Sequence, residues 1–201
     1  MKLNVPFYRQ TGSQNCGPVA LKMVLSYFGD SRNVEELEEL SGAKDGKGVS
    51  TMQIAVAAGL LGYRVDLFSK YLLFNEDNLK HDYYKNYSDM DVEQSKKWLE
   101  IARVAGVNVE EKVLSLEELL GFISERTIPI VLLDWNVAMG RKEKGYQGHF
   151  VPVVGYDDRN VYIHNHGLSD TQEFMPIAKG VFDEARKADG TDEDIVFIYK
   201  K

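Results

Sequence analysis

The chemistry-bearing residue that stands out is Cys16, the only cysteine among 201 residues, in the stretch SQNCGPVALKMVLSYFG. It directly precedes Gly17 and Pro18, and an apolar run with helical spacing follows. Unpaired N–H groups and a partial positive charge at a helix N-terminus favour a thiolate, the nucleophilic form of cysteine. We expect Gly17 to leave room for a carbonyl beside the sulfur. The alternative is that Cys16 is a small buried hydrophobic residue.

A cysteine nucleophile needs a base, usually histidine, and a third group that orients it. His149 opens the apparent strand HFVPVVGY, and Asn165 lies between His164 and His166 in the next strand. Strand alternation puts both of these histidines on one face and Asn165 on the other. A hairpin can bring Asn165 to His149, so the predicted catalytic order is Cys16, His149 and Asn165.

A zinc site is the competing interpretation of the same residues. His164 and His166 share a face and could bind metal together with His149 or Cys16. The chain lacks CxxC and HExxH spacings, so the thiol interpretation is favoured. The remaining histidine, His81, lies in a polar region and is expected to be solvated.

Composition narrows the class of protein. The formal net charge of −7 disfavours nucleic acid or an anionic membrane surface as a partner. No stretch approaches the roughly 18 apolar residues of a membrane span. A lone cysteine cannot form an internal disulfide, and the N-terminus lacks a signal-peptide core, so we expect a cytoplasmic protein.

Periodicity and capping signals predict helices in the first part of the chain and strands in the second. The expected helices follow Cys16, Asn33, Ser50, Asp91 and Ser115, with a further helix at about 177–188. The expected strands are 63–68, 130–135, 149–156, 161–165 and 195–199, with Pro152 indicating an edge or a bulge. This order is typical of an α+β fold. Residues of about 70–115 have unclear periodicity and are interpreted as an insertion.

The stretch VPFYRQTGSQNCGPVALKMVLSYFG resembles the N-terminal motif of the bacteriocin-processing, double-glycine-leader cysteine peptidases of the papain-like superfamily. Gln10 stands six residues before Cys16, where that family has its oxyanion-hole glutamine, and this spacing favours it over Gln14. GHFVPVVGYDDRNVYIHN resembles the histidine strand and hairpin of the family. The resemblance implies one papain-like domain over residues 1–201, with a helical N-terminal half packed on a mostly antiparallel C-terminal sheet.

The resemblance implies a thiol hydrolase that cleaves a peptide or amide bond through an acyl-enzyme, with no cofactor. Cys16 is then the nucleophile, His149 the base, Asn165 the orienting group and Gln10 an oxyanion donor. The family more often has Asp at the position of Asn165, and this chain resembles a free-standing relative without transporter regions. An acyltransferase or amidase with the same residues, or a silent peptide-binding module, are the alternatives; the sequence makes no prediction of oligomeric state.

Overall fold

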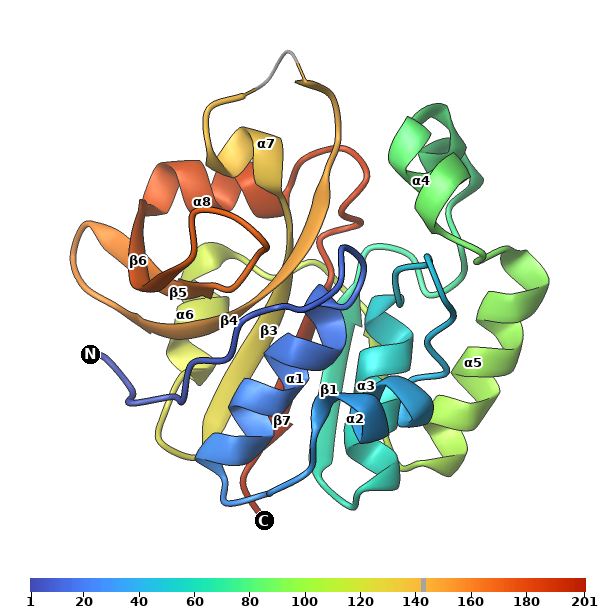
Figure 1. Cartoon of the computed structure of the whole chain (residues 1–201), viewed down its shortest axis with the longest axis horizontal. Coiled ribbons are helices and arrows are strands. Elements are labelled where there is room, and N and C mark those ends of the chain that lie inside the picture. Colours follow the sequence, from blue (N-terminus) through green and yellow to red (C-terminus); the bar gives the residue numbers. More distant parts are fainter. Residues whose placement is uncertain (142–143) are drawn as a thin grey trace.

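One seven-stranded mixed sheet forms the centre of the computed structural model, which describes residues 1–141 and 144–201 (Figure 1). The strand order is β2-β1-β7-β3-β4-β5-β6, and β1 and β2 form the parallel pair while the other described pairs are antiparallel. The bounds are β1 Arg64–Ser69, β2 Asn108–Glu111, β3 Thr127–Asp134, β4 Gly148–Tyr156, β5 Asn160–Asn165, β6 Gln172–Ala178 and β7 Ile195–Tyr199.

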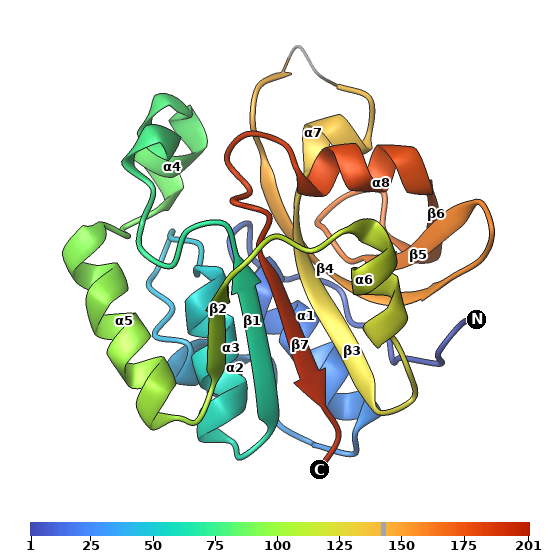
Figure 2. The same cartoon turned by 180° about the vertical axis from the view of Figure 1, so that it is seen from behind.

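Helices cover both faces of this sheet. Helices α1 to α3 lie on one face, and α6 and α8 lie on the other (Figures 1 and 2). The bounds are α1 Cys16–Tyr27, α2 Val34–Leu40, α3 Thr51–Leu60, the 3-10 helix η1 Glu76–Lys80, α4 Asp82–Tyr87, α5 Val92–Val104, α6 Leu116–Phe122, α7 Trp135–Ala138 and α8 Lys179–Arg186. The α+β class predicted from the sequence is therefore confirmed.

The predicted helix starts are local features that the structure reproduces. Asn33, Ser50 and Ser115 each accept a hydrogen bond from the backbone N–H three residues later, within a complete capping box. Asp91 caps α5 by accepting from Gln94 N–H. Gly29, just after α1, has φ of +91°, a conformation that a residue without Cβ adopts at low cost.

Strands β2 and β6 and the short helices η1, α4 and α7 were not predicted. Strand β2 is the polar segment NVEE, which has no apolar alternation because it lies at the sheet edge, paired with β1. Strand β6 contains Phe174 at φ of +49° and its register against β5 shifts, so its side-chain alternation is broken.

Pro152 does not mark an edge strand, because β4 lies between β3 and β5. Pro152 pairs with Ile130 of β3, and the β4–β5 register shifts between Val153 and Gly155, immediately after the proline. The bulge half of the expectation is therefore correct, and the edge half is wrong. A proline lacks the N–H that a regular central ladder requires, which accounts for an irregularity here.

Residues 70–115 contribute η1, α4, α5 and the edge strand β2. Helix α5 packs on α3, and α4 stands apart at the end of the sheet where β4 begins (Figure 1). Within the described part of the chain, none of these helices or the others is long and apolar enough to cross a membrane.

Candidate active site

A cleft with a volume of about 580 Å³ lies where α1 and β4 begin. It is large enough for a ligand of ordinary size. Cys16, His149, Asn165 and Gln10 all line it, although they come from the first 16 residues and from two later strands. The topology thus brings together every residue that the sequence singled out for catalysis.

Cys16 is the first residue of α1, which packs on β4. Asn15 occupies the N-cap position, but its side chain makes no capping hydrogen bond to the helix. Its amide group instead donates to Thr11 and Glu38 and accepts from the Gly12 N–H. The N–H groups of Cys16 and Gly17 are therefore not capped by Asn15 and hydrogen-bond the Cys16 sulfur instead.

The Cys16 thiol is buried, with 8% of the residue exposed. Burial raises the pKa of the thiol, while hydrogen bonds from the backbone of Phe150, Gly17 and Cys16 itself act in the opposite direction. Since burial is the larger effect, the resting sulfur is a neutral thiol. The helix N-terminus was expected to favour the thiolate, but it does not outweigh desolvation in this structure.

Gly17 does not provide room for substrate, contrary to the expectation from the sequence. A Cβ atom at Gly17 would lie 2.7 Å from Cγ2 of Val49 and 2.8 Å from Cδ1 of Ile54. Ile54 belongs to α3, so the missing side chain allows α1 and α3 to approach closely. Gly17 is a packing residue beside Cys16.

His149 lies in β4 opposite Leu133 of β3, and 7% of it is exposed. Its ring contacts Trp135 edge-on at a centroid distance of 4.9 Å and lies 4.9 Å from the ring of His166. Burial and the neighbouring His166 lower the pKa of His149 well below its ordinary value, and a hydrogen bond with the Asn165 side chain opposes this shift. The resting imidazole is therefore neutral and able to accept a proton.

Asn165 ends β5 on the same side of the sheet as His149 and is 2% exposed. Its Nδ2 donates to the Asp170 carbonyl at 2.6 Å, and its Oδ1 accepts weakly from the Gly167 N–H at 3.4 Å. The loop after β5 thus fixes the amide plane. With the side-chain hydrogen bond to His149, this geometry suits an orienting residue.

Gln10 is attached to the same strand end, because its N–H donates to the His166 carbonyl at 2.8 Å. Its side-chain Nε2 donates to the Gly12 carbonyl at 2.5 Å, which leaves the second amide hydrogen available to the cleft. Gln14 also lines the cleft. The burial of Gln10, of which 9% is exposed, agrees better with a preorganised donor.

The other histidines have structural contacts. His164 Nε2 lies 2.9 Å from the Val5 carbonyl and its Nδ1 accepts from the Phe174 N–H. His166 lies within hydrogen-bond distance of the Cys16 and His164 carbonyls through its two ring nitrogens. These engaged nitrogens argue against the zinc interpretation, and residues 1–141 and 144–201 contain no group of three or more His, Cys, Asp or Glu that could hold a metal.

His81 was expected to be solvated, but it packs against the ring of Tyr146 at 5.2 Å and pairs with Asp189. Its neighbours in α4 line the cleft. Tyr83 and Tyr87 from α4 and Tyr146 from the segment before β4 form an aromatic wall. The run HDYYKNY was the available signal, since aromatic residues at helical spacing in a polar segment need a packing partner.

Comparison with known proteins gives a family and a fold. The model of the family described as guanylylate cyclase matches residues 5–198. Guanylyl cyclase 1 of Arabidopsis thaliana is 24% identical over 213 residues, which cover 98% of this chain and 76% of that protein.

Solved structures with the same fold are peptidase domains. The peptidase domain of the Streptococcus bifunctional ABC transporter ComA has a TM-score of 0.54 and 14% identity, covering 96% of each chain. A double glycine motif protease of an AMS/PCAT transporter, bound to a leader peptide, has a TM-score of 0.53 and 16% identity over 99% of this chain and 93% of that one. A C39-like peptidase structure from Bacillus anthracis has a TM-score of 0.55 and 17% identity over 100% and 98%.

These likenesses establish the papain-like C39 fold that the sequence resemblance implied. The structural likeness does not make this chain a member of the bacteriocin-processing peptidase family. Its sequence matches the guanylylate cyclase family model instead.

Proposed function

The chain belongs to the guanylylate cyclase family, and we propose that it is a thiol hydrolase that cleaves a peptide or amide bond. One observation carries this proposal: Cys16, His149, Asn165 and Gln10 line one cleft although they come from distant parts of the chain. The peptidase fold of the structural neighbours is a second support. Residues 70–115 are then an insertion in one domain of residues 1–201, and α4 shapes selectivity.

In the proposed reaction both catalytic groups start neutral. The Cys16 sulfur attacks the substrate carbonyl carbon as His149 takes the thiol proton. The Cys16 N–H and the Gln10 amide stabilise the resulting oxyanion, and Asn165 holds the imidazole in place. The C–N bond then breaks as His149 gives its proton to the leaving amine. Water, deprotonated by His149, hydrolyses the thioester and releases the acid and the free thiol.

The test is hydrolysis of a peptide library by the wild-type protein and four variants, read by mass spectrometry. Cys16→Ala should abolish cleavage, and Asn165→Ala should lower kcat by about tenfold or more. Gln14→Ala is the matched control for Gln10→Ala, and it should change kcat less. Trapping of a mass adduct on Cys16, with no adduct on Cys16→Ala, identifies the acyl-enzyme.

Other outcomes of this experiment select the alternatives. Product formation only when an amine is added indicates an acyltransferase. Peptide binding with no adduct and no product in any condition indicates a silent peptide-binding module and overturns the proposal.

A second candidate follows from the family, namely cyclisation of guanosine triphosphate. Arg141 and Lys144 line the cleft, and cations at that place suit a polyphosphate. Incubation with guanosine triphosphate and Mg²⁺, followed by nucleotide chromatography, tests it. Cyclic product that persists in Cys16→Ala and falls in Arg141→Ala would favour the cyclase over the hydrolase.

A further inference from the structure

A smaller cavity of about 110 Å³ lies beside the catalytic cleft. Tyr83, Tyr87 and Tyr146 line both spaces, so these rings separate the cavity from the cleft. A Cβ atom at Gly148, the neighbour of His149, would lie 3.3 Å from the Tyr83 ring and 2.8 Å from the Tyr146 hydroxyl. The tyrosine rings that line the cavity therefore lie directly against the residue that precedes His149.

The walls of the cavity are mainly aromatic and apolar. Tyr84 stacks on Tyr146 at 5.4 Å, and Tyr83 meets Tyr146 edge-on at 5.4 Å. The other aromatic residues of the lining are Tyr71, Phe74, Trp98 and Phe150. Aromatic ring faces attract cations as well as apolar groups.

Three buried polar atoms of the cavity lining have no hydrogen-bond partner among the described residues, namely Asp194 Oδ1, Asn78 Oδ1 and the Tyr146 hydroxyl. Asp194 Oδ2 accepts from Thr51 Oγ1, but its Oδ1 is shielded from solvent and has no partner among the described residues. Asn78 is 1% exposed; its Nδ2 donates to Asp192 at 2.8 Å, and its Oδ1 has no partner within the described chain. Burial raises the pKa of Asp194 to about 7, in keeping with a carboxylate that lacks a countercharge.

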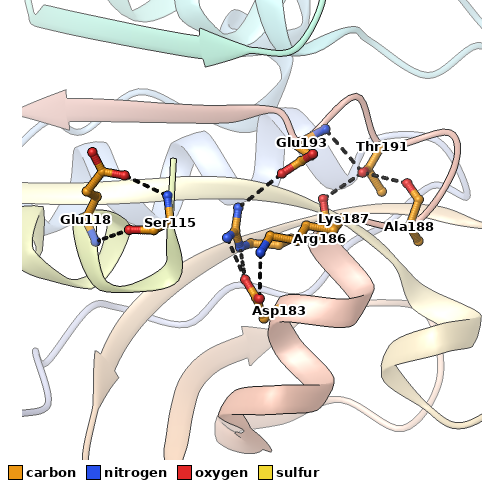
Figure 3. Close-up of polar contacts among 8 residues, drawn as sticks. All are labelled: Ser115, Glu118, Asp183, Arg186, Lys187, Ala188, Thr191 and Glu193. Carbon is orange, nitrogen blue, oxygen red and sulfur yellow. Dashed lines mark hydrogen bonds and ion pairs between the residues drawn. The ribbon is translucent and has the colours of Figure 1, made fainter. Parts of the chain in front are cut away.

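The loop that carries Asp192 and Asp194 is held in place from the opposite side of the sheet. Arg186 of α8 is fully buried, donates to Asp183 at 2.8 Å and lies 3.8 Å from Glu193 (Figure 3). The Thr191 hydroxyl lies within hydrogen-bond distance of the Arg186 and Ala188 carbonyl oxygens (Figure 3). Asp192 and Glu193 have φ of +50° and +55°, a costly conformation for these residues. The carboxylates are thus positioned by a dedicated set of contacts.

We propose that this cavity is a specificity pocket for a lysine or arginine side chain of the substrate. An N–H-bearing cation supplies the donors that Asp194 Oδ1 and Asn78 Oδ1 lack, and the tyrosine rings surround its alkyl stem. The proposal rests on the proposed hydrolase function, because it assigns the substrate of that site. An apolar side chain would leave the carboxylate unpaired, which is costly, and 110 Å³ is too small for a nucleotide.

The first test uses pairs of peptides that differ only by lysine or norleucine at one position. A separate pair is made for each position on either side of the scissile bond. At one position, kcat/KM for lysine should exceed that for norleucine by about tenfold or more. Asp194→Asn should lower the ratio of kcat/KM for lysine to that for norleucine to about one. Asp158→Asn, which removes an exposed carboxylate far from the cavity, should retain it. Equal rates for lysine and norleucine at every position overturn the proposal.

The second test does not depend on catalysis. n-Butylammonium and 1-butanol are titrated into the protein, and the ring-proton NMR signals of the tyrosines are followed. Saturable shifts are expected with butylammonium only, at least about tenfold weaker in Asp194→Asn and unchanged in Asp158→Asn. Butylammonium binding without any peptide hydrolysis leaves the pocket standing and refutes the hydrolase. Peptide hydrolysis with no lysine preference and no butylammonium binding supports the hydrolase and refutes the specificity pocket.

Discussion

At the residue scale, the site contains two buried ionisable groups whose pKa values are shifted in opposite directions. Desolvation raises the pKa of Cys16 and lowers that of His149, so both shifts favour the neutral forms. A preformed thiolate–imidazolium pair would need the opposite shifts. Proton transfer in this cleft is therefore expected to accompany attack on the substrate.

Alkylation of Cys16 tests this protonation state. Because only the thiolate reacts, the alkylation rate with iodoacetamide should be low at neutral pH. The rate should increase only when the pH exceeds the ordinary cysteine pKa of about 8.5. His149→Ala should leave the midpoint unchanged, since no ion pair is lost. The measurement is a rate profile from pH 5 to about 10 by intact mass. A fast plateau at acidic pH that disappears in His149→Ala would establish an ion pair instead.

At the element scale, the start of α1 combines two requirements. Its first turn must keep backbone N–H groups free, and Asn15 meets this by directing its side chain away from the helix. The helix must also approach α3 closely, and Gly17 meets this by lacking a side chain. The position of Cys16 at the cleft thus depends on the packing of the next residue, Gly17.

Gly17→Ala is expected to lower the free energy of unfolding by about 1–3 kcal/mol, because Val49 and Ile54 would have to move. Urea unfolding followed by far-UV circular dichroism measures it. Gly121→Ala in α6 is the control, since no atom lies within 4 Å of its added Cβ. That variant should be neutral or slightly stabilising through helix propensity. Equal behaviour of the two variants would refute the packing role.

At the scale of the whole molecule, the sheet connects the N-terminal helices to the strands that carry His149 and Asn165. The N-terminal segment runs along β4 and β5, with hydrogen bonds from Leu3 to Val154 and from Gln10 to His166. On the opposite face, Arg186 joins α8 to the loop before β7. The cleft therefore depends on contacts between segments more than 100 residues apart, and so does the cavity, through the Thr51–Asp194 and Asn78–Asp192 hydrogen bonds.

Arg186→Ala is expected to cost about 3–5 kcal/mol of stability, since it removes a fully buried cation from Asp183 and Glu193. Arg126→Ala, at an exposed site, should change stability by less than about 0.5 kcal/mol. Thermal and urea unfolding of both variants provide the comparison. A loss below about 1 kcal/mol for Arg186→Ala would mean that the pair holds neither α8 nor the loop.

The sequence by itself determined the helix starts and the candidate catalytic residues. A capping box such as Ser50–Gln53 spans three residues, and strand alternation separates Asn165 from its neighbouring histidines, so both can be predicted locally. Only the tertiary structure shows the directions in which the pKa values of Cys16 and His149 are shifted, the packing role of Gly17 and the cavity at Asp194. These depend on burial, and burial is created by segments that are distant in the chain.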